Sequence, residues 1–489
     1  MYRRKLNQVT IYEDPAMFGG LALNPDNEWV KLAKLIPWWA FEERYAALFS
    51  EKKGQPACSV RMALGACLIK EKYRLSDEAT VEQIAMNPYY QYFIGLAEYR
   101  QTAPFNATMM VRFRQRLTPE MLQDINDVII GRKKPEDIVK KDEDQDKDHH
   151  DDGGNSGKPE EESAATPNEG TLILDATCAP QAIRFPTDTS LLNEARLNSE
   201  EIIDALHEAG LTDGKKPRTY REKAKNQYNS FSKARKKGAK KIAKARKQQL
   251  NYLRRNFGYI DAIIKKHPDD WKQALNKWQL DRLTVIRTLY SQQREMFDNH
   301  TNRIDDRIVS LSQPWVRPIV RGKQCAPVEF GAKIEMSDIG GFLRVEDLRW
   351  NAFNEGKTLK DSVEAYRKTY GHYPERVLAD KIFRTSENLK YCREHGIHLN
   401  GPRLGRPSKD EKTRKEEERI EWVESGERGD IERRFGICKR CYSLGRVTAK
   451  LKQTSEVVIH LSVLTLNLQK RLRSLLRFLY WVLRRYAMT

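Results

Sequence analysis

The chain has 489 residues, of which 39% are hydrophobic and 32% charged, and its formal net charge is +19. This length predicts two or three domains with a sizeable core, and so large a positive charge predicts a polyanionic partner, most simply nucleic acid. The seven cysteines fall at irregular spacings, which argues against a secreted disulfide framework. The N-terminus lacks the apolar run of a signal peptide, and the apolar run at 457–469 is too short to span a bilayer, so we expect a cytosolic protein.

Residues 1–131 carry a helical pattern of apolar residues and predict an all-α N-terminal domain. One helix, expected to start at Asn106, bears Arg112, Arg114 and Arg116. Two interpretations stay open. The domain docks on DNA as a helix-turn-helix does, or it is a plain helical bundle with a basic face. Residues 132–169 then lose almost all apolar side chains and predict a disordered acidic linker.

Short apolar runs that end in an acid indicate strands beyond this linker. Residues 171–177 form one such run with Asp175 near its end, and residues 179–186 are expected to return as its paired strand. Residues 375–380 form another run, which ends in Asp380. Strand-end acids often face a site at the edge of a sheet, although each one alone is more simply a turn or capping residue.

A helical and strongly basic section, at about residues 187–313, interrupts the strand pattern. Between positions 213 and 255 the sequence has 17 Lys or Arg and two acids, Asp213 and Glu222, with aromatic residues between the cations. A solvated helix does not need charge of one sign, because like charges repel and lower its stability. We therefore interpret this section as a surface that contacts phosphates.

A later helix carries an acid between two cations. Arg428, Glu432 and Lys439 are separated by four and by seven residues, which places all three on one helical face. Ordinary surface ion pairs would give the same spacing. Together with Asp175 and Asp380, however, Glu432 completes a set of three acids. Neighbouring carboxylates repel one another and tolerate ionisation best when a divalent cation lies between them. Two such ions can activate a water or a 3′-hydroxyl and stabilise the leaving oxygen.

The residues around these acids resemble the bacterial insertion-sequence transposases of the DDE superfamily, in the branch related to the insertion-sequence-five group. Several blocks match in order, among them Leu174-Asp-Ala-Thr-Cys-Ala-Pro180 and Val377-Leu-Ala-Asp380-Lys-Ile-Phe-Arg-Thr385. The other matching blocks lie at 186–196, 316–323, 327–333 and 399–407. The helix with Glu432 resembles the Tyr-x2-Arg-x3-Glu-x6-Lys signature, except that Ser425 stands where the tyrosine would be.

This resemblance implies an α/β or α+β fold with an RNase H-like catalytic domain at 170–445, built on a five-stranded mixed sheet. The basic helical insertion at about 187–313 would interrupt it, and amphipathic helices would follow at 446–489. The resemblance also implies that Asp175, Asp380 and Glu432 are catalytic and bind Mg²⁺ or Mn²⁺, as two ions.

Double-stranded DNA is the implied partner, both as the ends of the element and as the target, bound by a homodimer in the bacterial cytoplasm and nucleoid. The residues that we expect to contact this DNA are Arg428, Lys439, Lys381, Arg384, Arg403, Arg406, Lys236, Lys237, Lys240, Lys241, Arg112, Arg114 and Arg116.

Three functions follow from the sequence. The first is an active transposase that cleaves and rejoins DNA. The second is a transposase-derived DNA-binding protein that has lost catalysis, and the third is an RNase H-fold nuclease without joining activity. The presence of all three acids argues against the second function.

Overall fold

The computed structural model describes residues 2, 14–15, 18–50, 54, 56–139, 167–212, 214–320, 328–401 and 410–486. The chain divides into two compact units. The first contains Met1–Pro180, Lys333–Arg349 and Phe353–Thr489, and the second contains Gln181–Ala332 and Trp350–Ala352. Most of the predicted acidic linker, residues 140–166, lies outside the described residues. Across the described parts of the chain, no helix has the length and apolarity needed to cross a membrane.

The first unit opens with short helices whose starts follow from their capping residues. Ser59, Ser76 and Thr118 each accept a hydrogen bond from the backbone N–H three residues on, which the first helical turn would otherwise leave unpaired. The helices are α1 (Glu28–Leu35), α2 (Glu42–Ala46), α3 (Val60–Tyr73), α4 (Asp77–Met86), α5 (Pro88–Phe93), α6 (Thr108–Arg116) and α7 (Pro119–Ile129), with the 3-10 turn η3 (Trp38–Phe41).

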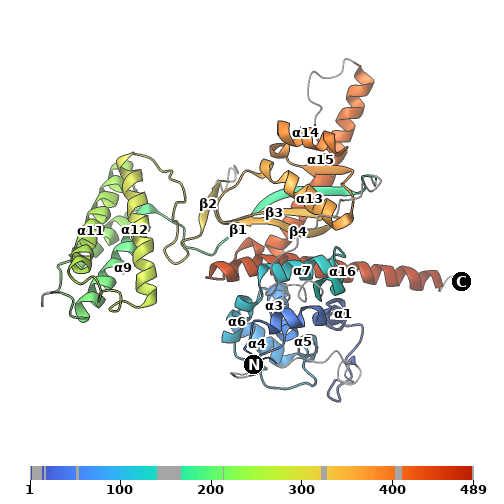
Figure 1. The fold of residues 1–489 in the computed structure, drawn as a ribbon, viewed down its shortest axis with the longest axis horizontal. Coiled ribbons are helices and arrows are strands. Elements are labelled where there is room, and N and C mark those ends of the chain that lie inside the picture. Colours follow the sequence, from blue (N-terminus) through green and yellow to red (C-terminus); the bar gives the residue numbers. More distant parts are fainter. Residues whose placement is uncertain are drawn as a thin grey trace, which may run out of the picture. The chain divides into compact units, whose positions relative to one another are not determined.

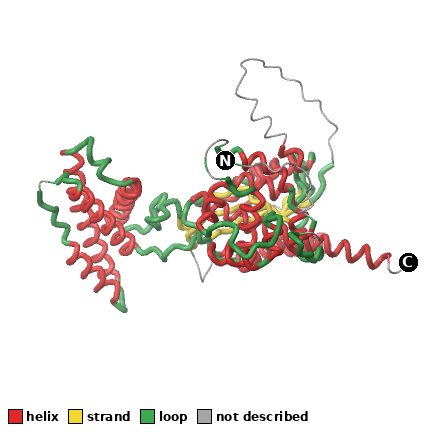
Figure 2. The backbone as a smooth tube through the Cα atoms, turned by 90° about the horizontal axis from the view of Figure 1, so that it is seen from below, coloured by secondary structure: helices red, strands yellow, loops and turns green. Residues whose placement is uncertain are grey.

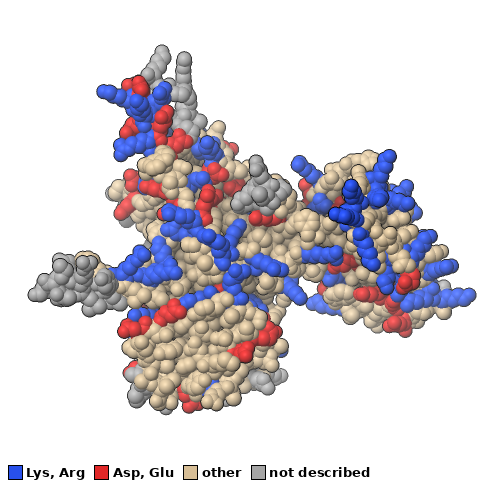
Figure 3. Space-filling model, turned by 180° about the vertical axis from the view of Figure 1, so that it is seen from behind, with Lys and Arg blue, Asp and Glu red and all other residues tan. Residues whose placement is uncertain are grey.

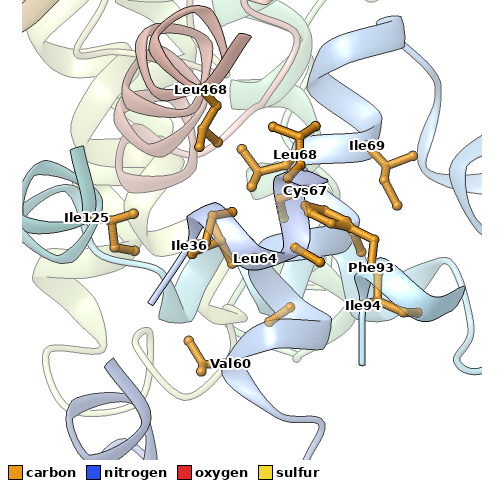
Figure 4. Packing of buried hydrophobic residues seen from close by; sticks show 14 of the residues in the cluster. Ile36, Val60, Leu64, Cys67, Leu68, Ile69, Phe93, Ile94, Ile125 and Leu468 are labelled. Atoms are coloured by element: carbon orange, nitrogen blue, oxygen red, sulfur yellow. The ribbon is translucent and has the colours of Figure 1, made fainter. Parts of the chain in front are cut away.

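The C-terminal segment packs into this N-terminal core. It forms one helix, α16 (Lys452–Tyr486), which contacts α1, α3, α6 and α7. Figure 4 shows Leu468 of α16 close to apolar side chains such as Leu64 and Leu68 of α3. Ile138, just beyond α7, is buried in the same core. The core is therefore assembled from segments more than 300 residues apart in the sequence.

A buried amide ties α16 to α7 and to the sheet. The side-chain nitrogen of Asn467 donates to Asn126 Oδ1 at 2.8 Å and to the backbone oxygen of Leu343 at 2.6 Å. Its side-chain oxygen accepts from the Leu343 N–H at 3.0 Å. Asn467 is fully buried, so none of these groups can turn to water instead.

Replacing Asn467 with alanine is expected to lower the free energy of unfolding by about 3 kcal/mol, because buried partners lose their hydrogen bonds. Urea denaturation followed by circular dichroism measures this loss. Gln453→Ala serves as the control, since Gln453 is exposed on the same helix and donates only one hydrogen bond, to the Gln115 backbone oxygen. Equal losses for the two variants would contradict a special role for the buried amide.

The described residues also form a mixed sheet of six strands (Figure 1). Its strands are β1 (Thr171–Pro180), β2 (Arg317–Val320), β3 (Val328–Ile339), β4 (Phe342–Arg349), β5 (Arg376–Ala379) and β6 (His398–Leu399). The order is β2-β3-β1-β5-β6, and β4 also pairs with β3. The β1–β5 and β5–β6 pairs are parallel, whereas β3 is antiparallel to β2 and to β4.

Two expectations about this sheet were wrong. The described residues form six strands rather than five. Residues 179–186 do not return beside residues 171–177. Instead β1 runs on to Pro180, and the next residue, Gln181, donates its N–H to the Phe330 backbone oxygen at 2.8 Å. The neighbours of β1 are β3 and β5, which come much later in the sequence. Local turn signals do not reveal such long-range partners.

Helices flank the sheet in the first unit. They are α13 (Leu359–Tyr370), α14 (Ser386–Glu394) and α15 (Glu411–Cys441), with the 3-10 turns η4 (Glu355–Lys357), η5 (Lys381–Phe383) and η6 (Ser443–Gly445). An apolar cluster that includes Leu174, Val363 and Val377 joins β1, α13 and β5. The long helix α15 packs against both β1 and β5.

The second unit is mainly a helical bundle, in which α9, α11 and α12 pack on one another (Figure 2). Its helices are α9 (Asp188–Glu208), α10 (Arg221–Lys233), α11 (Ala239–Lys266) and α12 (Lys277–Asp298). Capping boxes at Thr187 and Asn276 fix the starts of α9 and α12. Buried residues such as Ile202, Leu253 and Ile286 form a core of this unit's own. The chain between β1 and β2 therefore has the means to fold as a separate body.

Candidate active site

Asp175 lies within β1, and Asp380 directly follows the neighbouring parallel strand β5. The register pairs Leu174 of β1 with Ala379 of β5, so each aspartate is the residue that comes next after this pair. Adjacent strands lie about 4.8 Å apart, and side chains at matching positions point to the same face. The register therefore sets two acids that are more than 200 residues apart in the sequence on adjacent segments of the chain.

The two aspartates differ in their surroundings. The Asp175 side chain is only 14% exposed, and its Oδ1 accepts a hydrogen bond from the Ala176 N–H at 2.8 Å. Asp380 is exposed and caps η5, where its Oδ1 accepts from the Lys381 N–H at 2.7 Å. One acid is thus held at the edge of the core, and the other faces solvent at the start of a turn.

Glu432 approaches these strands from α15, which begins at the capping residue Asp410. Arg428, one turn before Glu432, joins the acids. Its Nη1 lies 3.3 Å from Glu432 Oε1 and 4.0 Å from Asp175 Oδ2. Of the predicted stripe, Arg428 therefore reaches β1, whereas the Glu432 side chain stays 57% exposed.

Burial raises the pKa of the Asp175 carboxyl to about 6 from its ordinary value of 3.8. The Ala176 N–H and the Arg428 guanidinium partly oppose this rise, because both stabilise the charged form. The carboxylates of Glu432 and Glu355 add to it by repulsion. Asp175 is therefore harder to ionise in the folded chain than a carboxyl in water.

This raised pKa predicts a pH dependence of stability for the metal-free protein. The folded carboxyl keeps its proton up to about pH 6, whereas the unfolded one keeps it only up to about 3.8. The stabilising contribution is thus fully present below pH 3.8 and is lost as the pH rises through about 6. The full shift corresponds to about 3 kcal/mol.

Asp175→Asn removes this titration. In EDTA, we expect the variant to unfold at a higher temperature than the wild type at pH 8, with the difference shrinking toward pH 4. Thermal melts across this pH range provide the measurement. A melting difference that does not depend on pH would contradict the assignment.

The donor set suits a hard divalent cation. Carboxylate oxygens are the ligands that Mg²⁺ and Mn²⁺ prefer, and Asp175, Asp380, Glu432 and Glu355 carry more negative charge than Arg428 offsets. In their present positions, no three His, Cys, Asp or Glu side chains of the described residues form a group that could hold a metal ion. The chemistry of the residues fits a metal, although their side chains are not arranged around one.

Glu355 is the acid that sequence reasoning missed. It lies on η4, in a segment with no apolar run before it, and its Oε1 pairs with Lys333 Nζ at 2.7 Å. Arg434 was also missed. It fixes α15 through a contact of 2.7 Å with the buried Asp338 and a hydrogen bond of 2.9 Å to the Gly341 backbone oxygen.

The basic residues expected to contact DNA near these acids differ in their exposure and in their contacts. Lys381 is exposed directly after Asp380, and Lys439 lies partly exposed on α15. Arg384 instead donates to the backbone oxygens of Leu399 and Asn400, so its guanidinium braces the fold beside β6. Arg403 and Arg406 lie outside the described residues.

For one of the three arginines of α6, the prediction of a DNA contact was wrong, and this residue is Arg114. It is buried and makes two hydrogen bonds to Asp77, at 2.8 and 2.7 Å, so it cannot reach DNA. Arg112 is exposed, and Arg116 lies over the Phe49 ring with its guanidinium 4.3 Å from the ring centroid. The spacing of arginines along a helix did not indicate which of them turns inward.

The four lysines predicted in the basic section are all exposed. Lys236 and Lys237 lie between α10 and α11, and Lys240 and Lys241 lie in the first turn of α11. Figure 3 shows many Lys and Arg side chains on the surface of the second unit. A polyanion would therefore find these cations accessible.

Comparisons with known proteins match two parts of the chain to transposase families. Residues 377–469, which include Asp380 and Glu432, match the family described as transposase DDE domain. Residues 21–116 match a second family, described as transposase domain. The chain is also 30% identical over 179 residues to "Uncharacterized protein ORF8 in nfe locus" from Rhizobium meliloti, covering 35% of this chain and 71% of that protein. No solved structure matches the chain.

The mixed sheet and the matched domains define an enzyme of DNA transposition. The chain belongs to the insertion-sequence transposases of the DDE type. The family as a whole acts on DNA and uses divalent metal ions.

Proposed function

We propose that this protein binds the ends of an insertion sequence and catalyses metal-dependent cleavage and strand transfer. Asp175, Asp380 and Glu432 are its catalytic acids, set in an RNase H-like domain. The observation that carries the proposal is the parallel register of β1 and β5, which aligns the two aspartates beside the helix that bears Glu432. Neither an exposed surface pair nor an isolated strand-end cap requires that alignment.

The three acids would hold Mg²⁺ or Mn²⁺, as two ions, and the bound metal would activate the attacking water or 3′-hydroxyl and stabilise the leaving oxygen. The protein's own residues prepare the site for this. Arg428 lies within 4.0 Å of Asp175 and within 3.3 Å of Glu432, which keeps two repelling carboxylates in one place. Burial of Asp175 favours its pairing with a cation, because charge is costly in a poorly hydrated position.

Exposed cations beside the acids would position the DNA backbone. Lys381 follows Asp380 directly, and Lys439 lies on the same helix as Glu432. Both are suited to phosphate contacts, which fix the register of a duplex without reading its bases. We assign end recognition to the N-terminal helices, with Arg112 and Arg116 as candidate contacts, and we place the protein as a homodimer on nucleoid DNA in the cytoplasm.

A strand-transfer assay tests this function. The substrates are labelled duplexes that carry the inverted repeats bordering the gene, incubated with supercoiled target DNA and Mg²⁺. A transposase joins the label to the target. Cleavage without joined product would identify a nuclease, and binding without cleavage would identify a DNA-binding derivative.

A further inference from the structure

A second short turn lies against the turn that starts at Asp380. Glu355 opens η4, Asp380 caps η5, and the two turns pack on each other. The approach is so close that a Cβ at Gly356 would lie 2.7 Å from the Ile382 backbone oxygen. The Asn388 side chain clamps both turns, because its nitrogen donates to the Gly356 oxygen at 2.6 Å and to the Phe383 oxygen at 2.8 Å. Glu355 is thereby fixed beside the turn of a catalytic aspartate.

Lys333 neutralises Glu355 from β3, the strand next to β1. Its Nζ lies 2.7 Å from Glu355 Oε1, donates to the Phe353 backbone oxygen at 2.7 Å, and lies 4.7 Å from the centroid of the Phe353 ring. The side chains of Lys333 and Glu355 are 13% and 16% exposed. This is a well-shielded ion pair, so its charges act more strongly than those of a surface pair.

Asp380 caps η5, so the packing of η4 on η5 sets the Lys333–Glu355 pair next to the turn of one of the three proposed metal ligands.

We propose that Glu355 is a fourth carboxylate of the metal site. Without metal it pairs with Lys333, and a divalent ion replaces Lys333 as its partner when the site is loaded. The inference rests on the proposed function, because it assumes that Asp175, Asp380 and Glu432 bind the metal. In the metal-free chain, the ammonium of Lys333 forms an ion pair with the Glu355 carboxylate, which is the group that the metal would bind. On loading, Glu355 turns toward the metal, while Lys333 keeps the Phe353 oxygen and the Phe353 ring.

This exchange predicts opposite effects for the two partners of one ion pair. Glu355→Gln removes a negative charge and a ligand oxygen from the site, so metal binding weakens by about tenfold or more. Lys333→Met removes the competing cation, so the variant binds the metal as tightly as the wild type or more tightly. A purely structural ion pair would give the same sign for both variants.

Mn²⁺ binding by the full-length protein tests the proposal without relying on activity. Free Mn²⁺ is followed by electron paramagnetic resonance during titration, and circular dichroism confirms that each variant is folded. Glu28→Gln is the matched control, because it breaks a Lys–Glu pair of 2.6 Å with Lys72 among the N-terminal helices. We expect this control to bind Mn²⁺ like the wild type.

The outcomes separate this inference from the proposed function. Weaker binding by Glu355→Gln, together with unchanged or tighter binding by Lys333→Met, supports the exchange. If Asp175→Asn loses Mn²⁺ binding but Glu355→Gln keeps it, the metal site stands and only the role of Glu355 is overturned. If both Glu355→Gln and Lys333→Met bind more weakly, Lys333 supports the site rather than competing with the metal. If the wild type binds no Mn²⁺, the metal site and this inference both fail.

Discussion

Asp175→Asn is expected to abolish DNA cleavage while leaving the fold and DNA binding intact. An amide carries no charge and is a poor ligand for a hard cation, so the variant loses its place in the metal site. Losing several kcal/mol of transition-state stabilisation slows cleavage by about a thousandfold or more. The measurement is Mg²⁺-dependent cleavage of labelled end DNA, with binding followed in Ca²⁺ or EDTA.

Asp361→Asn is the matched control, because Asp361 is an exposed acid on α13 and the substitution changes the charge equally. It should cleave like the wild type. The stability of Asp175→Asn provides a second check. Since burial raises the pKa of Asp175, the metal-free variant should be at least as stable as the wild type at pH 8. An inactive protein that is also more stable cannot owe its inactivity to unfolding. Substantial cleavage by Asp175→Asn would remove this residue from the metal site.

Local patterns in the sequence were sufficient to propose the three acids of the candidate site. Asp175 and Asp380 could be predicted because each ends an apolar run, and Glu432 because its spacing from Arg428 and Lys439 is helical. The placement of Asp175 beside Asp380 depends on strand register, and the resemblance to a family supplied that expectation. Register is a long-range property that no single run encodes.

The features that escaped prediction share one cause. Glu355 lies beside the turn that Asp380 caps because η4 packs on η5, and Gly356 and Asn388 make that packing possible. Arg114 turns inward because Asp77, on another helix, accepts its hydrogen bonds. In both cases the deciding partner is distant in the sequence, and the residue itself looks like any other charged residue on a helix or turn.

The charged residues of the N-terminal core and those of the candidate site differ in how well they are paired. Arg114 and Asp77 are paired within the N-terminal core, where breaking the pair would leave a buried charge. Asp175 has Arg428 only at 4.0 Å, and two other carboxylates oppose its ionisation. A site that keeps its acids poorly neutralised gives up stability in the metal-free state and gains affinity for a cation.

The exposed lysines at the start of α11 are expected to control how strongly DNA binding depends on salt. Lys236, Lys237, Lys240 and Lys241 are all exposed, within a section that has 17 cations and two acids. We predict that they hold phosphates without reading bases. Each phosphate contact adds about −0.9 to the slope of log affinity against log salt. Replacing all four with Gln should therefore flatten the slope by up to about 3.6.

Binding to end DNA and to random DNA across a salt series gives these slopes, and the ratio of the two affinities should change little. Lys240→Gln/Lys241→Gln removes two cations and should flatten the slope by up to about 1.8. Arg287→Gln/Arg294→Gln removes two cations of the same unit that already pair with Asp261 and Asp298, so its slope should stay near that of the wild type. Equal slopes for both double variants and the wild type would show that this surface does not contact DNA. Its one-signed charge would then require a different partner, such as an acidic surface of another protein.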